Sequence, residues 1–232
     1  MSAVASLAAI GPLERSTLEE RVYGHIRELL MSGRLAPGEK VSLRATAEAL
    51  GVSIMPVRAA VSRLVADRAL EVTPHRAVRV PVMSAAAFRE LTLVRIEIEG
   101  FAAERAAQVA SSDYLAVQEA EMAFRSLAIG TTPNLAEAVR LNKEFHFAVY
   151  RAAALPSLLE IIGGLWLKAG PVINLDLRAN PERLATSRAI GFHADVLSTI
   201  KTGDAKGARA AVAADISGAA EFILSRGGLA DI

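Results

Sequence analysis

The sequence predicts a mainly α-helical protein in two parts, the first of which also contains a small β-hairpin. Between residues 22 and 80, short apolar stripes at helical spacing are followed by a pair of short strand-like runs. After residue 82 the strand pattern stops, and amphipathic periodicity broken by turn signals predicts about six further helices in an antiparallel bundle. We therefore expect a flexible tail over residues 1–16, a first domain over residues 17–82 and an all-helical second domain over residues 83–228.

The first predicted helix ends near Gly33. Its apolar stripe at helical spacing consists of Val22, Ile26, Leu29 and Leu30. Gly33 and the pair Pro37-Gly38 then supply stop signals. This segment is expected to be one amphipathic helix followed by a turn.

Two more helices around a tight turn are predicted next. The apolar contacts of the shorter one and its turn come from Ala47, Leu50 and Val52. Gly51 can take the left-handed conformation that ends this helix, and Ser53 can cap the next. The apolar stripe of that next helix consists of Val57, Val61, Leu64 and Val65. Its opposite face, with Met55, Arg58 and Ser62, is free to enter a groove of DNA.

The run from Ala69 to Pro81 is predicted to form two short strands joined by a turn, with His75 and Arg76 at its tip. Together with the helices this is the layout of a winged helix-turn-helix. In that fold the second helix of the pair reads the major groove, and the wing contacts the DNA backbone or the minor groove. The alternative is a small helical domain that binds no DNA.

The composition agrees with a two-domain protein. Of its 232 residues, 52% are hydrophobic, which is ample for a core. The chain has no cysteine, which excludes disulfides and thiolate metal sites and is compatible with a reducing cytoplasm. Residues 1–82 hold 11 Lys+Arg against 8 Asp+Glu, whereas the remainder hold 15 against 17. Positive charge therefore gathers where phosphate contacts are expected.

Neither apolar segment of the chain is expected to meet a membrane. The first residues lack the positive lead of a secretory signal, since the first basic residue is Arg15. The run from Leu155 to Leu175 is interrupted by charged residues, glycines and prolines, so it predicts a buried, broken helix. We expect a cytoplasmic protein.

Four polar side chains interrupt the apolar stripes of the predicted second domain. Asn142 and His146 lie one turn apart on the helix after Pro133, while His193 and Asp215 interrupt the stripes of the last two helices. Polar groups on inward faces need hydrogen bonds, ions or water, because leaving them bare costs roughly several kcal/mol. These interruptions suggest one shared site.

The spacing of two of these residues supports a shared site. His193 lies eleven residues before Asp204, and Asp215 lies eleven after it. If the chain folds back at Gly203 and Asp204, equal rise per residue brings both side chains to one level. Two imidazoles with oxygen ligands suit a divalent metal such as zinc, nickel or manganese. The alternative is that both histidines are ordinary core residues and that Asp215 pairs with an arginine.

Arg95 also interrupts an apolar stripe and is expected to point inward. A buried guanidinium needs an anion. One candidate is Glu99, one turn further along the helix, as a structural pair. The other is the carboxylate of a small ligand held jointly by Arg95 and the metal. Tyr150 and Trp166 either line the same cavity or belong to the core.

The first part closely resembles the N-terminal domain of GntR-type bacterial transcription regulators. The motifs that carry the resemblance are Gly33-Arg-Leu-Ala-Pro-Gly38, Leu43-Arg44, Ala47-Glu-Ala-Leu-Gly-Val-Ser53, Pro56-Val-Arg58 and His75-Arg76. The resemblance implies that Arg44 and Arg58 contact phosphate and guanine, and that Ser53 and Met55 stand at the head of the reading helix. It also implies that His75 and Arg76 are the wing residues that meet DNA.

The second part resembles the all-helical effector domain of the FCD branch of these regulators. The motifs are Arg95-Ile-Glu-Ile-Glu99, Asn142-Lys-Glu-Phe-His146-Phe, and His193-Ala-Asp-Val-Leu with Gly203-Asp204-Ala. Many members bind a divalent metal through an Asp and a His four apart and two later His separated by twenty-two. Here Asn142 and Asp215 stand in place of the Asp and the last His. The usual effectors of the branch are organic acids, sugar acids, amino acids and fatty acyl derivatives.

These observations predict a transcription regulator and not an enzyme. A homodimer would bind a pseudo-palindromic operator through two winged domains, and a small acid in the helical domain would modulate that binding. Two alternatives are a metal-dependent hydrolase domain fused to a DNA-binding head, and an architectural DNA-binding protein without effector.

Overall fold

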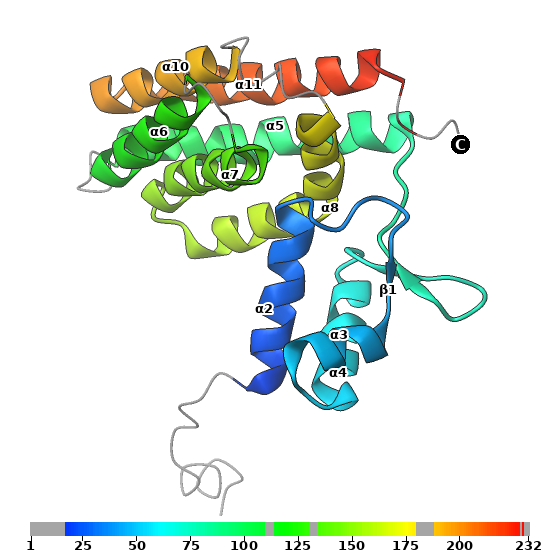
Figure 1. Ribbon diagram of the computed structural model, residues 1–232. Coiled ribbons are helices and arrows are strands. Elements are labelled where there is room, and N and C mark those ends of the chain that lie inside the picture. Colours follow the sequence, from blue (N-terminus) through cyan, green and yellow to red (C-terminus); the bar gives the residue numbers. More distant parts are fainter. Residues whose placement is uncertain (1–16, 110–113, 130–133, 180–187, 228, 230–232) are drawn as a thin grey trace, which may run out of the picture.

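A small N-terminal domain lies on one side of a bundle of long helices (Figure 1). This computed structural model describes residues 17–109, 114–129, 134–179, 188–227 and 229. We call residues 17–82 the N-terminal domain and residues 83–227 the helical domain. The expected tail over residues 1–16 lies outside the described residues.

The N-terminal domain contains three helices and three short strands. In chain order they are α2 (Leu18–Met31), β1 (Lys40–Val41), α3 (Leu43–Leu50), α4 (Ile54–Ala66), β2 (Glu71–Val72) and β3 (Val78–Arg79). A capping box starts α2, because Thr17 and Glu20 each bind the other's backbone N–H through their side chains. Gly51 ends α3 with a left-handed φ of 63°, as predicted.

The wing is larger than the predicted hairpin. β1 adds a third strand, in the order β1-β3-β2, and both pairings are antiparallel. A strand of two residues shows no alternation of apolar and polar positions, so periodicity could not reveal it. The predicted pairing of β2 with β3 is confirmed, with Glu71 opposite Arg79 and an ion pair of 2.5 Å between them.

Two local predictions around α4 are wrong. Leu50 was expected to pack, yet it is 37% exposed, because it is the last residue of α3 and Val52 beyond the turn makes the core contact instead. Ser53 stands at the N-cap position of α4, but its side chain makes no capping hydrogen bond. The predicted inward stripe is confirmed for Val57, Val61 and Leu64, which are buried.

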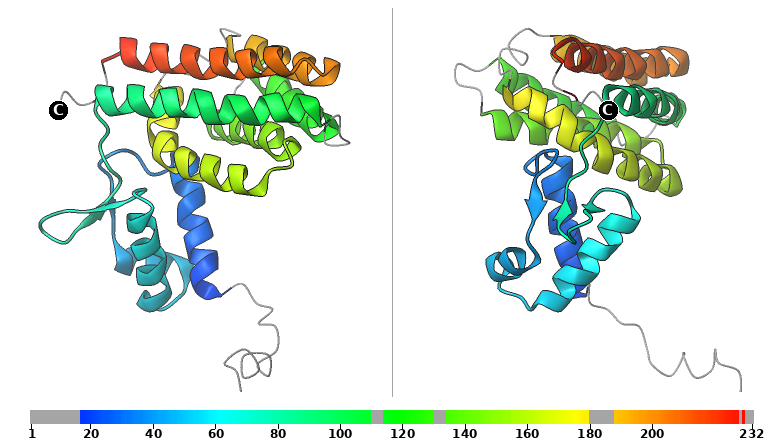
Figure 2. Two further views of the ribbon diagram at one scale, coloured as in Figure 1. Left: turned by 180° about the vertical axis from the view of Figure 1, so that it is seen from behind. Right: turned by 90° about the vertical axis from the view of Figure 1, so that its right-hand side faces the viewer.

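Six helices form the helical domain within the described ranges, as expected. They are α5 (Ala85–Gln108), α6 (Tyr114–Ala128), α7 (Leu135–Ala152), α8 (Pro156–Ala179), α10 (Arg188–Thr202) and α11 (Ala205–Ser225). The long helices α5 and α11 lie side by side (Figures 1 and 2). Ser84 caps α5 by accepting from the backbone N–H of Ala87.

The predicted break between Leu155 and Leu175 is absent. This segment belongs to one helix, α8, which bends along its length (Figures 1 and 2). Pro171 lies inside the helix, where a proline removes one backbone hydrogen bond and favours a bend. Among the described helices, none combines the length and the hydropathy that crossing a bilayer requires.

The two domains share a continuous apolar core. The largest buried cluster joins Val22, Ile26 and Leu30 of α2 to residues of the helical domain such as Phe145 and Trp166. The end of α2 lies against α8 (Figure 1). A Cβ on Gly170 of α8 would lie only 2.9 Å from the Cα of Met31, so the glycine permits this close approach.

Candidate metal centre and DNA-binding surface

Two imidazoles and one carboxylate converge inside the helical domain. They are His146 from α7, His193 from α10 and Asp215 from α11, and all three are buried. The Nε2 atoms of His146 and His193 lie 3.2 Å and 3.9 Å from Oδ2 of Asp215. One donor atom from each residue lies within 4.8 Å of the others. Such a group could bind a metal ion.

The turn between α10 and α11 brings His193 and Asp215 to one level. Gly203 adopts a left-handed φ of 71°, and Asp204 caps α11 by accepting from the backbone N–H of Gly207 at 2.9 Å. The chain therefore folds back where the turn was predicted. The expectation from the two eleven-residue spacings is confirmed by the 3.9 Å contact between the side chains.

His193 is a buried imidazole without a hydrogen-bond partner. Its side chain is 0% exposed, and neither ring nitrogen has a partner among the described residues. The ring stacks on Phe145 with 3.9 Å between centroids and tilts against Phe124 at 4.7 Å. Burial lowers the pKa of His193 to about 3 despite the nearby charge of Asp215. The ring is therefore neutral, and a nitrogen lone pair is available.

Asp215 keeps its charge in this buried position. Burial favours its protonated form, but the contact with Nε2 of His146 and the positive charge of Arg95 lower the pKa of Asp215 below its usual value. The three convergent side chains therefore offer two imidazoles and an anionic oxygen.

A second buried carboxylate, Glu99 of α5, connects Arg95 to this group. Glu99 is 0% exposed, and its Oε1 accepts from Nε of Arg95 at 2.7 Å. Its Oε2 accepts from the hydroxyl of Tyr150 and from the indole Nε1 of Trp166, the latter at 3.1 Å. The hydroxyl of Tyr150 in turn lies 3.2 Å from Nδ1 of His146. A continuous polar chain thus runs from Arg95 to His146.

Arg95 points inward, as predicted, and its structural pair with Glu99 is present. The side chain is 6% exposed, and its guanidinium carbon lies 5.3 Å from the ring centroid of Trp166. Burial opposes the charged form, but Glu99 outweighs it and raises the pKa of Arg95 above its ordinary value. Glu99 engages only part of the guanidinium, which leaves other N–H groups for a further acceptor.

Tyr150 and Trp166 are core residues whose polar atoms both serve Glu99. Each is almost completely buried. Burial and the charge of Glu99 raise the pKa of Tyr150 well above its ordinary value, so its hydroxyl stays protonated and donates. From the sequence, a large aromatic residue in a helical stripe indicates a core position and no hydrogen-bond partner. Glu99 could therefore be predicted as a partner for Arg95, but not as the acceptor for Tyr150 and Trp166.

Asn142, the fourth predicted ligand, lies one turn before His146 on α7 and is half-buried. Its side chain makes no hydrogen bond to another part of the chain that the structure describes, so its role as a ligand stays a prediction. The structure thus brings together three of the four predicted ligands.

The face of α4 predicted to enter a DNA groove is open. Met55 is 64% exposed, and Arg58 and Ser62 are exposed beside it. Arg44 on α3 is exposed as well, and the hydroxyl of Ser53 is not used for capping. These four predicted DNA contacts (Arg44, Ser53, Met55 and Arg58) are therefore accessible, and their individual roles stay predictions.

The tip of the wing is a tight turn that exposes both of the residues predicted to meet DNA there. The backbone N–H of Thr73 donates to the carbonyl of Ala77 at 2.8 Å, and His75 and Arg76 between them are exposed. Arg76 has a φ of 59°, in the left-handed region that side chains rarely adopt. This wing has no glycine at its tip, and Arg76 itself supplies the left-handed residue.

Lys143 is a functional candidate that sequence reasoning missed. Its side chain is 9% exposed, and its Nζ lies 2.6 Å from both carboxylate oxygens of Glu28 in the N-terminal domain. The available signal was its position between Val139 and Phe147 on the buried stripe of α7. We call this ion pair, together with the hydrogen bond from Asn174 to the backbone carbonyl of Met31, the interdomain latch.

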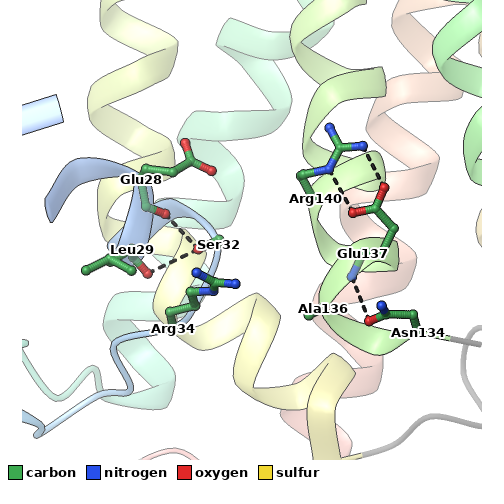
Figure 3. A pocket seen from close by; sticks show the side chains of 8 residues that line it. All are labelled: Glu28, Leu29, Ser32, Arg34, Asn134, Ala136, Glu137 and Arg140. Atoms are coloured by element: carbon green, nitrogen blue, oxygen red, sulfur yellow. Dashed lines mark hydrogen bonds and ion pairs between the residues drawn. The ribbon is translucent and has the colours of Figure 1, made fainter. Parts of the chain in front are cut away.

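Asn174 of α8 makes the second contact of the latch. It is 1% exposed, and its Nδ2 donates to the backbone carbonyl of Met31 at 2.7 Å. Beside the latch, a cleft of about 350 Å³ separates the end of α2 from the start of α7 (Figure 3). Arg34 lines it on one side and the ion pair of Glu137 with Arg140 on the other. The ion pair of Lys143 with Glu28 therefore joins α7 to the end of α2 beside this cleft, and the start of α7 stands apart from α2 across it.

Family models match both domains of the chain. The model described as bacterial regulatory proteins, gntR family, matches residues 18–80, and the FCD domain model matches residues 90–218. The HTH-type transcriptional regulator McbR of Escherichia coli (strain K12) is 30% identical over 200 residues, which cover 86% of this chain and 89% of McbR. The uncharacterized HTH-type transcriptional regulator YdhC of Bacillus subtilis (strain 168) is 27% identical over 124 residues, 53% of this chain and 55% of YdhC.

Solved structures share the architecture. E. coli McbR/YncC superimposes with a TM-score of 0.84 at 27% identity, covering 92% of this chain and 100% of that one. A GntR regulator from Rhodococcus sp. RHA1 has the same fold, with a TM-score of 0.73 at 21% identity over 90% of this chain and 99% of that one. The expectation of a DNA-binding transcription regulator, and not an enzyme, is confirmed by these matches. This chain belongs to the GntR family of bacterial transcription regulators, in the branch with an FCD domain.

Proposed function

We propose that this regulator binds a pseudo-palindromic operator as a homodimer, and that a small organic acid bound in the helical domain changes its affinity for the operator. A divalent ion held by His146, His193 and Asp215 would assist the acid's binding. The observation that carries the proposal is the convergence of these three buried donors within 4.8 Å of one another. In this proposal residues 17–82 bind DNA, and residues 83–228 bind the effector and form the dimer.

The donor geometry supports a metal ion. Two ligands of a tetrahedral zinc lie about 3.3 Å apart, given bonds of about 2.0–2.2 Å, close to the 3.2 Å between His146 and Asp215. The unpartnered nitrogens of His193 fit the same reading, since a bare buried imidazole is costly. Imidazole and carboxylate ligands suit zinc, nickel or manganese, with Asn142 as a possible fourth donor. The ion would supply a positive centre for a carboxylate oxygen.

The second anchor for the acid is Arg95. Its charge is retained, and Glu99 leaves part of its guanidinium free. Arg95 is joined to His146 through Glu99 and Tyr150, so the guanidinium and the metal donors belong to one buried polar region. A metal ion and a guanidinium fork together recognise a carboxylate well.

The interdomain latch offers a route from the site to DNA. His146 and Lys143 lie on α7, one turn apart, and Lys143 binds Glu28 of the N-terminal domain. A shift of α7 caused by a bound ligand would therefore act on the ion pair that holds α2. A tenfold change in operator affinity needs only about 1.4 kcal/mol of difference between the two arrangements.

Exposed apolar side chains on α6 and just beyond its end support the homodimer. Leu115 and Met122 lie on one face of α6 and are 62% and 57% exposed, and Ile129, directly after the helix, is 71% exposed. Exposed apolar surface of this kind marks an interaction site. A dimer formed by the helical domains would present two winged domains to the two half-sites of an operator.

The proposal is tested by selecting an operator from a pool of random DNA duplexes and measuring its binding by fluorescence anisotropy. Zinc and a library of small carboxylic acids are then added, with thermal melting measured in parallel. We expect at least one acid to raise the melting temperature and to change operator affinity about tenfold. His193→Phe keeps an aromatic ring in the stack with Phe145 and removes both nitrogens, so the acid response should be lost and the fold kept.

Arg58→Ala is the matched control. It should weaken operator binding and leave the melting response to the acid unchanged, because Arg58 is exposed in the other domain. If no acid in a broad library changes either melting or operator affinity, the effector proposal fails and the protein is an architectural DNA binder.

A further inference from the structure

We propose that Tyr150 and Glu99 are positioning residues, which hold the proton of His146 on Nδ1 and thereby direct its Nε2 lone pair toward Asp215. This inference rests on the proposed metal site and deepens it, since it names the pair that sets which nitrogen of His146 binds the ion.

The hydrogen bonds of Glu99 fix the direction of the Tyr150 hydroxyl. Glu99 accepts from Arg95 at 2.7 and 3.3 Å and from the indole N–H of Trp166 at 3.1 Å. Donors surround the carboxylate, so it is an acceptor in every contact. A tyrosine hydroxyl has one proton, and here that proton goes to Glu99.

The oxygen of Tyr150 can then only accept from the imidazole. Nδ1 of His146 lies 3.2 Å away and is its other neighbour in the described structure, so Nδ1 carries a proton. In a neutral imidazole the remaining nitrogen is a bare lone pair. That nitrogen, Nε2, lies 3.2 Å from the carboxylate of Asp215.

Two lone pairs facing each other at this distance need a positive charge between them. A divalent ion would supply it. The group that orients the ring is then Tyr150, held by Glu99. Metal-binding histidines commonly bind a further partner through the second nitrogen, and loss of that partner lowers metal affinity about 10–100-fold.

The same contacts link the two anchors of the proposed effector site. Arg95 and Tyr150 share the Glu99 carboxylate, so a ligand that draws Arg95 away from Glu99 changes the charge balance at the side chain that holds Tyr150. The metal ligand and the guanidinium are therefore coupled through one buried side chain.

The test is zinc titration of the full chain by calorimetry, with Tyr150→Phe as the variant and Tyr23→Phe as the matched control. Tyr23 also donates to a carboxylate, that of Asp67, but in the N-terminal domain. We expect Tyr150→Phe to lower zinc affinity about 10–100-fold and Tyr23→Phe to leave it unchanged. Equal zinc affinity in Tyr150→Phe and the unmodified protein overturns the proposal.

Nitrogen-15 NMR of the histidine side chains gives a second readout that does not depend on the variant. With zinc bound, we expect His146 to carry a proton on Nδ1 and the metal on Nε2, and the reverse assignment would overturn the proposal. If zinc does not bind at all, the metal half of the proposed function fails. The metal-free spectra still test the inference, because Tyr150→Phe must then change which nitrogen of His146 carries the proton. Identical spectra for Tyr150→Phe and the unmodified protein would refute it, and so would a proton on Nε2 alone in the unmodified protein.

Discussion

The interdomain latch makes a quantitative prediction, because its two charged groups are buried to different extents. The side chain of Lys143 is 9% exposed and that of Glu28 is 51% exposed. Glu28→Ala would leave a buried ammonium with only Glu144, 3.6 Å away, as a weak partner among the described residues. Since a hydrogen bond to a charged group contributes about 1.5–3 kcal/mol, we expect Glu28→Ala to lower the free energy of unfolding by about 2 kcal/mol.

Removing the charge of Lys143 should lower the free energy of unfolding by less than removing that of Glu28. Lys143→Met keeps the packing of the aliphatic stem and leaves Glu28, which water can reach, so we expect a loss of about 0.5–1 kcal/mol. The double variant has no charged group left at these two positions and should resemble Lys143→Met, which gives a coupling between the two sites of about 2 kcal/mol. Which of the two single variants loses more stability therefore reports whether the ammonium of Lys143 is buried.

The assay is urea unfolding followed by the fluorescence of Trp166, the one tryptophan of the chain, which is buried in the helical domain. Glu71 and Arg79 form the matched control pair, since their side chains are 40% and 41% exposed. Substitution of either should cost a similar and small amount, about 0.2–1 kcal/mol. Equal losses for Glu28→Ala and Lys143→Met, or a larger loss for Lys143→Met, would refute the reasoning.

Three further predictions concern other parts of the molecule. Arg58→Ala should weaken operator binding and reduce the slope of log affinity against log salt by about one, and an unchanged slope in gel shifts would refute the assignment of α4 as the reading helix. Ala154→Gly should raise the free energy of unfolding by about 0.5–1 kcal/mol, because Ala154 has a φ of 54°. Ala153→Gly next to it is buried and right-handed and should lower that free energy, so thermal melts that move in the same direction would contradict the argument. Asn142→Asp should raise zinc affinity by roughly tenfold, about 1.4 kcal/mol, because an anionic oxygen is a better ligand than an amide, and calorimetry that shows no change would remove Asn142 from the ligand set.

Periodicity was sufficient for most of the fold because each long helix buries one continuous stripe. It failed for α8, where glycines and a proline suggested a break. A Cβ on Gly170 would lie 2.9 Å from the Cα of Met31, whereas a Cβ on Gly163 would meet only the flexible end of the Arg27 side chain. Gly170 therefore permits close packing against α2, and a sequence alone does not separate that role from a helix stop.

The convergence of the candidate metal ligands could be predicted as far as single helix faces determine it. His146, His193 and Asp215 each interrupt an apolar stripe, and the turn at Gly203 fixes the level of two of them. The support around them depends on how α5, α7 and α8 cross, which no local pattern reveals. The shared acceptor role of Glu99 therefore required the structure.

The interdomain latch was out of reach of the sequence for a related reason. Lys143 and Glu28 are 115 residues apart, and each belongs to a helix predicted on its own. An inward lysine signals that an anion is needed, but its partner is defined only by the docking of α2 on the helical domain.

The central claim, that the helical domain holds a divalent ion, is tested most directly by anomalous X-ray diffraction. Crystals of the unmodified chain, purified without chelator and supplied with zinc, would be measured on both sides of the zinc absorption edge. We expect an anomalous peak about 2.0–2.2 Å from Nε2 of His146, a ring nitrogen of His193 and the carboxylate of Asp215. The absence of a peak there at saturating zinc, with His193 still without a partner, would contradict the account.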